Sequence, residues 1–307
     1  MKNLFAFIKK PTDILEIYSI IKFYKVTNIT LYFIKCPWAE LKDLKKYTLI
    51  KLSKLCNNII VKDDYELSLK NINWFDELKK FKLVAIPANQ FSFFYLILNR
   101  LKKKNVKTIL ISDGVIDILS TFKFVLSTNS FISLITYKFL KYFLLFNVKT
   151  DECFFTLYPL KANFSKKTKP VTNTYLPDKN VVKLLKKSKV KNLVIGGKGL
   201  TISDFKKKFD LRNYCYTYRQ NKPNGRTSLT YLIINDKKIK LNNILLSEEI
   251  INTKLIKNVY SYLSTSAFYA IQKNISVTVF YKKFDPYFLF YFLKKNFFSL
   301  LKCKKIS

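Results

Sequence analysis

Short apolar runs alternate with longer amphipathic stretches along most of this chain. In the first half, five apolar runs have the length and the polar flanks of buried strands, at residues 3–8, 28–34, 58–61, 82–87 and 108–112. A helical pattern opens at Pro11, and a second helix is expected near residues 39–56. Alternation of this kind predicts a parallel sheet with helices on both faces.

Residues 159–178 interrupt the pattern with three prolines and a lysine cluster, which favours a linker. The alternation then restarts. Helices are expected at 179–187, at 201–209 and from Ser264, and strands at 191–196, 213–218, 257–262 and 275–280. The predicted fold is α/β, with Rossmann-like domains at residues 1–158 and 179–285 and a cleft between them.

The C-terminal segment, residues 286–307, is rich in Phe, Tyr, Leu and Lys and is expected to form a helix. Two interpretations stay open for it. A basic helix with large aromatic rings suits the membrane interface, where rings bury and lysines meet anionic headgroups. A closing helix that packs across the two domains with its lysines outward fits the same residues.

The charge of the chain is extreme. Its 307 residues carry 56 Lys and Arg against 20 Asp and Glu, a formal net charge of +36. A charge of this size indicates an anionic partner, which is a nucleic acid, an anionic membrane surface or a phosphate-bearing substrate. The lysines are spread along the chain, so much of the excess is expected on a solvated surface.

The chain contains no histidine and five cysteines. The absence of histidine removes the commonest general acid and base and the commonest metal ligand. The cysteines are far apart, odd in number and without CxxC spacing, so a zinc site or a disulfide framework is not expected. Free thiols in a reducing cytoplasm fit this pattern.

Neither a signal peptide nor a membrane span is expected. The N-terminal apolar stretch is short and is not followed by a small-residue cleavage site. The most hydrophobic region, residues 124–148, is interrupted by Lys138 and Lys141, whereas a span needs about 20 nearly uninterrupted apolar residues.

The five glycines lie in three places: at Gly114, at Gly196, Gly197 and Gly199, and at Gly225. An average chain of this length has roughly 20. The first two places follow apolar runs, as at the carboxyl ends of buried strands, where open α/β sheets bind ligands. Ordinary strand-to-helix turns explain the same pattern.

Three segments carry candidate chemistry. Asp113, beside Gly114 at a strand end, is a candidate general base, although Asp-Gly is also a common turn. Residues 214–226 place several cations on one loop, which suits phosphate binding. A basic loop exposed to solvent fits the same residues. Ser264, Thr265 and Ser266 precede a helix, where hydroxyls and first-turn amides form an anion site or a simple N-cap.

Together these segments resemble the bacterial sialyltransferases of the lipooligosaccharide and polysialic acid type. The resemblance rests on the opening strand with KKPTDILEIYSII, on ISDG (111–114), ECFFTLYP (152–159), NLVIGGKGLTISDF (192–205) and YTYRQN (216–221), and most specifically on EEIINTKLIKNVYSYLSTSAFYA (248–270). It covers most of the chain in order. It implies the two-domain GT-B fold.

The resemblance also implies an activity: transfer of sialic acid, or a related acidic sugar, from a CMP-sugar to a cell-surface glycan, inverting and without a metal or other cofactor. The implied catalytic residues are Asp113 as the base, with Tyr218 and Arg219 at the leaving group. The implied donor-binding residues are Gly114, Gly196, Gly197, Leu200, Glu249, Ser264, Thr265 and Ser266. The expected location is the cytoplasmic face of an anionic membrane, and a homodimer is plausible by resemblance.

Two residues depart from the family pattern. Ser112 stands where the family has the first acid of a pair, and Tyr218 stands where it has a histidine. These departures motivate a second hypothesis, a nucleotide- or glycan-binding protein on the same fold with impaired catalysis. The charge alone motivates a third, nucleic-acid binding, but the chain has no recognised nucleic-acid motif and no concentrated basic arm.

Overall fold

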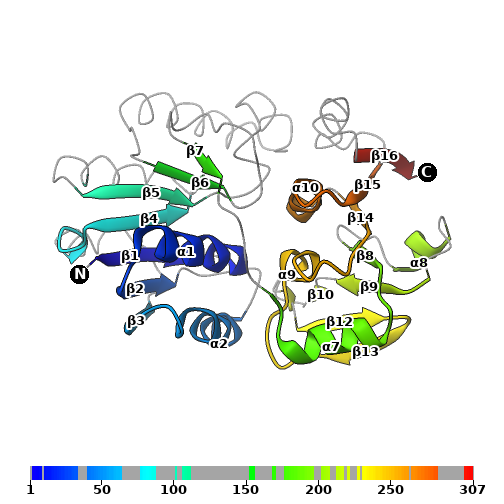
Figure 1. Ribbon diagram of the computed structural model, residues 1–307, viewed down its shortest axis with the longest axis horizontal. Helices are drawn as coiled ribbons and strands as arrows, with labels where there is room; N and C mark the ends of the chain where they lie inside the picture. The colour runs from blue at the N-terminus through cyan, green and yellow to red at the C-terminus, as the bar shows by residue number, and fades with distance from the viewer. Residues whose placement is uncertain are drawn as a thin grey trace. The chain divides into compact units, whose positions relative to one another are not determined.

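The computed structural model divides the chain into two compact units, Met1–Pro37 with Leu44–Asn173, and Trp38–Asp43 with Thr174–Ser307 (Figure 1). The residues it describes are 2–8, 10–33, 40–63, 77–87, 101, 106–111, 152–155, 168–170, 176–196, 202–207, 212–217, 220–221, 227–228, 230–262, 264–282 and 301–306.

The first unit is built on a seven-stranded sheet in the order β3-β2-β1-β4-β5-β6-β7, with every pair of neighbours parallel. The strands are β1 (Asn3–Ile8), β2 (Asn28–Phe33), β3 (Asn58–Asp63), β4 (Leu83–Pro87), β5 (Lys107–Ile111), β6 (Glu152–Phe155) and β7 (Thr168–Pro170). The chain winds outward from β1 to β3 and then returns to β4 on the other side of β1. This order is doubly wound, with its switch point between β1 and β4.

Sequence explains why β1 is central and why a helix follows it. Residues 4–8 are apolar without interruption and are all buried, as expected of a strand covered on both faces. Helix α1 (Pro11–Tyr24) begins with Pro11, and the Asp13 carboxylate accepts a hydrogen bond from the Lys10 amide at 2.9 Å. Helix α1 packs on β1, β5 and β6, and α2 (Leu41–Leu52) leads into β3.

The second unit has its own seven-stranded sheet, in the order β13-β12-β9-β8-β14-β15-β16. Its strands are β8 (Asn192–Ile195), β9 (Tyr214–Thr217), β12 (Tyr231–Ile234), β13 (Lys237–Lys240), β14 (Asn258–Tyr262), β15 (Ser276–Lys282) and β16 (Leu301–Ile306), and β10 (Gln220–Asn221) pairs separately with β11 (Thr227–Ser228). The five strands β9, β8, β14, β15 and β16 are parallel to their neighbours in this group, whereas β12 and β13 form an antiparallel hairpin on β9.

This second sheet is also doubly wound over its parallel part. From β8 the chain passes through α8 (Ile202–Lys206) to β9 on one side. After the hairpin it returns through α9 (Ser247–Ile251) to β14 on the other side of β8 and continues through α10 (Thr265–Gln272) to β15. The switch point therefore lies between β8 and β14. Helix α7 (Lys179–Lys187) precedes β8.

The α/β class with parallel sheets and the positions of most expected strands and helices are confirmed. Two boundaries need correction. Strand β7, at residues 168–170, lies inside the expected linker 159–178 but pairs with β6, so the first unit runs to Asn173.

The expected C-terminal helix is also corrected over residues 301–306. These residues form β16, which pairs in register with Val277–Lys282 of β15. Pairing with β15 gives their backbone groups hydrogen-bond partners, and lysines are common on edge strands because they discourage further pairing. Residues 286–300 of that expected helix lie outside the described residues. Across the part of the chain that the structure describes, no helix combines the length and apolar character needed to cross a membrane.

Candidate functional site

The switch point of the second sheet brings together residues that are far apart in sequence. Strands β8 and β14 run parallel and adjacent, with Ile195 opposite Ser261. Gly196 follows β8 directly, and Ser264 lies two residues beyond the end of β14. The two chain segments therefore leave the sheet side by side at its carboxyl edge, where open α/β sheets bind ligands.

Gly196 is required here by a neighbouring side chain. A Cβ atom on residue 196 would lie 2.1 Å from the Tyr216 hydroxyl oxygen and 2.6 Å from the ring carbon that bears it. The Gly196 amide donates to the Thr217 carbonyl at 3.0 Å. The group that approaches this glycine closely is thus the Tyr216 ring.

Ser264 is the N-cap of α10. Its side-chain oxygen accepts a hydrogen bond from the Ser266 amide at 3.2 Å, and its carbonyl accepts one from the Ala267 amide at 3.1 Å. This geometry confirms the capping interpretation of the hydroxyl run. The N-terminus of this eight-residue helix faces the same edge as Gly196, so its dipole also favours an anion there.

Ser266 is tied to a buried carboxylate. Its hydroxyl donates a hydrogen bond to Glu248 on α9 at 2.7 Å, and both residues are buried. Because the only proton of that hydroxyl is directed at Glu248, its oxygen lone pairs remain for other partners. In the contact with the Ser266 amide, the Ser264 side-chain oxygen accepts the hydrogen bond through a lone pair.

The two adjacent glutamates of α9 have different partners. The Glu249 carboxylate accepts a hydrogen bond from the Leu246 amide at 3.1 Å and so caps the start of the helix. Sequence reasoning selected Glu249 as a donor-binding residue, but the structure brings Glu248 to Ser266. The two acids are distinguished by their hydrogen bonds, Glu249 with the Leu246 amide and Glu248 with Ser266.

Three more hydroxyls lie beside this pair, and sequence reasoning missed them. Thr217 and Ser247 share a hydrogen bond of 2.9 Å between β9 and α9. Thr217, Ile195 and Ser261 lie in one register row, so Ser261 points to the same sheet face as Thr217. Ser261 is fully buried, and no hydrogen-bond partner for its hydroxyl lies within the described residues. The switch-point cluster therefore comprises Thr217, Ser247, Glu248, Ser261, Ser264 and Ser266.

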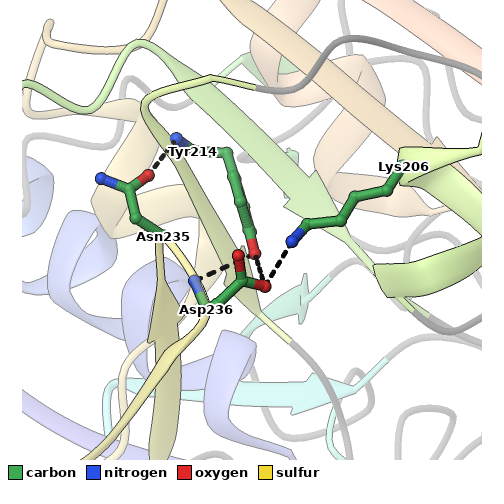
Figure 2. Close-up of polar contacts among 4 residues, drawn as sticks. All are labelled: Lys206, Tyr214, Asn235 and Asp236. Carbon is green, nitrogen blue, oxygen red and sulfur yellow. Dashed lines mark hydrogen bonds and ion pairs between the residues drawn. The ribbon is translucent and has the colours of Figure 1, made fainter.

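A second polar cluster lies at the opposite end of β9 (Figure 2). The Tyr214 hydroxyl donates to Asp236 at 2.7 Å and accepts from the Asp236 amide at 3.1 Å, and Lys206 forms an ion pair with the same carboxylate. Hydrogen bonds from Lys206 and then Tyr214 hold the pKa of Asp236 below its usual range. Burial, followed by the bond to Asp236, raises the pKa of Tyr214. This cluster joins α8 to the β12–β13 turn, away from the switch point.

Several expected site residues cannot be placed. Asp113, Gly114, Gly197, Leu200, Tyr218 and Arg219 lie outside the described residues, as does the side chain of Thr265. Of the expected donor-binding residues, the structure brings Gly196, Ser264 and Ser266 to one edge of the second sheet. Among the described residues, no group of three or more His, Cys, Asp or Glu side chains is arranged to hold a metal ion.

Comparison with known proteins adds a weak structural similarity. No protein-family model and no curated protein sequence matches this chain. Among solved structures, the chain is similar to a crystal structure of the glycosyl transferase family 9 from Veillonella parvula DSM 2008, with a TM-score of 0.37 and 8% identity over 99% of this chain and 86% of that one. A similarity at this level is too weak to carry an inference about fold or activity.

Proposed function

We propose that this protein is a glycosyltransferase that binds a CMP-activated acidic sugar, of the sialic acid kind, and transfers it to a cell-surface glycan. The observation that carries the proposal is the switch-point cluster of the second sheet. There, hydroxyls, a capped helix N-terminus and a buried carboxylate meet at the edge where doubly wound sheets bind nucleotides. Two doubly wound sheets in one chain support a GT-B arrangement.

The cluster suggests how a nucleotide would be held. The phosphate lies at the N-terminus of α10, and Ser264 donates its hydroxyl proton to a phosphate oxygen. Ser266, whose proton is held by Glu248, acts differently: its lone pairs accept a hydrogen bond from a hydroxyl or amino group of the nucleoside. Gly196, Gly197 and Leu200 border the nucleotide.

The chemical step is assigned to residues that the resemblance indicates. Asp113 deprotonates the acceptor hydroxyl, which then attacks the anomeric carbon and displaces CMP with inversion. Tyr218 and Arg219 stabilise the negative charge on the departing phosphate, Tyr218 by hydrogen bonding and Arg219 by its charge. Gly114 leaves room beside the base. The step needs no metal in this proposal.

CMP binding tests the site directly. Replacing Ser264→Ala is expected to raise the Kd for CMP, measured by calorimetry, about tenfold, because one charge-assisted hydrogen bond to phosphate is lost. Ser276→Ala is the matched control: it makes the same change in the same unit, but at the amino end of β15. Equal affinity for CMP in the wild type and the Ser264→Ala variant would contradict the proposal that the phosphate binds at the N-terminus of α10.

Turnover tests the activity. CMP release from CMP-sialic acid is expected to depend on a galactose-terminated acceptor, and Asp113→Ala is expected to abolish release while leaving CMP affinity unchanged. Full activity in that variant would exclude Asp113 as the base.

A second function is favoured by one observation, the complete absence of histidine from the sequence. A protein that binds a CMP-sugar or a glycan without transferring the sugar would have lost the usual proton donor to the leaving group. This alternative predicts saturable CMP binding with no acceptor-dependent release, so the two assays separate it from the transferase.

A further inference from the structure

The amino edge of the first sheet is unusually basic. Five exposed lysines lie there: Lys2, Lys25, Lys54, Lys80 and Lys82. Backbone hydrogen bonds tie the strand starts together, from the Thr27 amide to the Lys2 carbonyl at 3.2 Å and from the Asn57 amide to the Thr27 carbonyl at 2.9 Å. Lys82 precedes β4, which pairs with β1. We call these five lysines the basic edge.

Among the described residues, the segments next to the basic edge contain little compensating charge. Residues 22–27, 53–58, 79–83 and 106–107, which lie before or at the starts of β2 to β5, contain no Asp or Glu, whereas β6 begins with Glu152. Glu77, one turn before Lys80, forms an ion pair with Lys62. The helix dipole accounts for lysines that follow α1 and α2, such as Lys25 and Lys54. It does not account for Lys2 and Lys82, which lie at the starts of strands.

Large apolar side chains are exposed next to these lysines. Phe23, in the last turn of α1, is 53% exposed, and Leu49 and Ile50, near the end of α2, are 43% and 46% exposed. The segments that follow these helices are in contact through the Asn57–Thr27 hydrogen bond. The outward side of α2 also carries the exposed Lys42 and Lys46. Exposed apolar side chains among cations are typical of surfaces that enter the headgroup region of a bilayer.

We propose that the basic edge, with Phe23, Leu49 and Ile50, docks the protein on an anionic lipid bilayer. The lysines meet the headgroups, and the three apolar side chains enter the interface. A nucleic acid would use the lysines but would leave the apolar side chains unused. The inference extends the proposed transfer to a cell-surface glycan, yet it concerns a different surface from the C-terminal segment to which the sequence first pointed.

Vesicle co-sedimentation with the full chain tests the proposal. The edge variant carries Lys25→Gln, Lys54→Gln, Lys80→Gln and Lys82→Gln. The matched control carries Lys183→Gln, Lys187→Gln, Lys237→Gln and Lys240→Gln, four exposed lysines of the second unit, and therefore has the same net charge. On vesicles of phosphatidylcholine with phosphatidylglycerol, the edge variant is expected to bind at least tenfold more weakly than the wild type, and the control within about twofold of it.

A second variant tests the apolar part. Phe23→Ser with Leu49→Ser is expected to weaken vesicle binding several-fold while leaving binding to a DNA duplex unchanged. Equal losses of vesicle binding in the edge and control variants would mean that the attraction comes from charge spread over the whole surface, and this would overturn the proposal. Failure of the wild type to bind the vesicles would overturn it too, as would an edge variant that loses only duplex binding. Circular dichroism confirms that each variant is folded.

These outcomes are independent of the proposed chemistry. Vesicle binding requires neither CMP nor turnover, so a protein that binds vesicles through the basic edge but fails to bind CMP would contradict the proposed function alone. Conversely, a protein that binds CMP and releases it from CMP-sialic acid in solution, but does not bind vesicles, would support the proposed function and contradict this inference.

Discussion

At the scale of single residues, packing explains the glycine at position 196, which the family resemblance assigns to donor binding. The Tyr216 ring lies over its Cα, with ring carbons 2.6 Å and 2.7 Å from the position of a Cβ atom. Tyr216 is itself buried in a cluster with Val194, Phe205 and Phe280, so the ring has little room to move away. The glycine is therefore needed for the core of the second unit, whatever binds beside it.

Replacing Gly196→Ala is expected to lower the free energy of unfolding by about 1–3 kcal/mol, as overpacking of a buried site does. Tyr216→Phe should not relieve the cost, because the clashing ring carbons remain. Tyr216→Leu should relieve most of it. Urea denaturation of the single and double variants gives the coupling between the two positions, and additive costs would contradict the packing argument.

The Ser266–Glu248 pair is the second residue-scale test. Ser266→Ala removes the donor from a buried carboxylate, so we expect a loss of about 1–3 kcal/mol in the free energy of unfolding. Glu248→Gln keeps an oxygen that can accept the same hydrogen bond, so it should cost less. Urea denaturation ranks the two variants. The reverse order would mean that Glu248 is held mainly by contacts other than Ser266.

At the scale of elements, the β12–β13 hairpin is attached to β9 through its turn. Asn235 and Asp236 form the turn with φ of 45° and 72°, the left-handed values that two-residue hairpin turns require. The Asn235 side chain accepts a hydrogen bond from the Tyr214 amide at 3.0 Å, and Asp236 binds the Tyr214 hydroxyl (Figure 2). The antiparallel hairpin is thereby fixed in register beside a parallel sheet.

Tyr214→Phe should therefore cost about 1 kcal/mol in stability, because two hydrogen bonds of the hydroxyl are lost. Lys206→Met should cost less, since its ion pair with Asp236 is largely exposed to solvent. Chemical denaturation near neutral pH compares the two. An equal or larger loss of stability in Lys206→Met would mean that the ion pair with Asp236, and not the Tyr214 hydroxyl, contributes most to holding the hairpin.

The pH dependence of this cluster has a definite sign. The pKa of Asp236 is lowered in the folded protein, so its contribution is present above the unfolded pKa of about 3.9 and is lost as pH falls through the folded value. The difference in Tm between the wild type and Asp236→Asn should shrink as the pH is lowered from about 5 into this range. A difference that grows on acidification would contradict the assigned direction.

The sequence predicted most of the parallel strands because these are largely apolar runs bounded by polar residues, as in residues 4–8 of β1. The parallel strands β7 and β16 lack such a run and were missed. It did not predict the β12–β13 hairpin, although Asn235-Asp236 between Tyr231–Ile234 and Lys237–Lys240 has the composition of a hairpin. It also took residues 301–306 for helix, because the apolar residues at 301, 303 and 306 fit neither a two-residue nor a 3.6-residue period, and only the pairing with β15 defines the strand.

The candidate site was predictable in part for similar reasons. Ser264 and Ser266 were found because hydroxyls before a helical pattern have a local meaning as a cap. Thr217, Ser247 and Ser261 were missed because only the sheet order brings them together. The contact between Ser266 and Glu248 was missed because the sequence does not show which side of α9 faces α10.

At the scale of the whole molecule, each unit has its own doubly wound sheet and its own buried core. The proposed functions are divided in the same way. The candidate nucleotide site uses residues of the second sheet, at its carboxyl edge, whereas the basic edge uses residues of the first sheet, at its amino edge. Two such units are expected to open separately, so a ligand of one need not stabilise the other.

Hydrogen exchange with and without CMP tests this division. A ligand present at a hundred times its Kd stabilises the state that binds it by about 2.7 kcal/mol. Amide exchange that requires an opening in which the ligand is released is therefore slowed about a hundredfold. We expect the slowing in β8, α9, β14 and α10 and no change in β1 and β2. Cytidine, which lacks the phosphate, is the matched control and should protect α10 much less, since the proposed phosphate contacts are at its N-terminus. Protection confined to the first unit would move the nucleotide site to the β1–β4 switch point, because that is the other place where the chain forms the required sheet geometry.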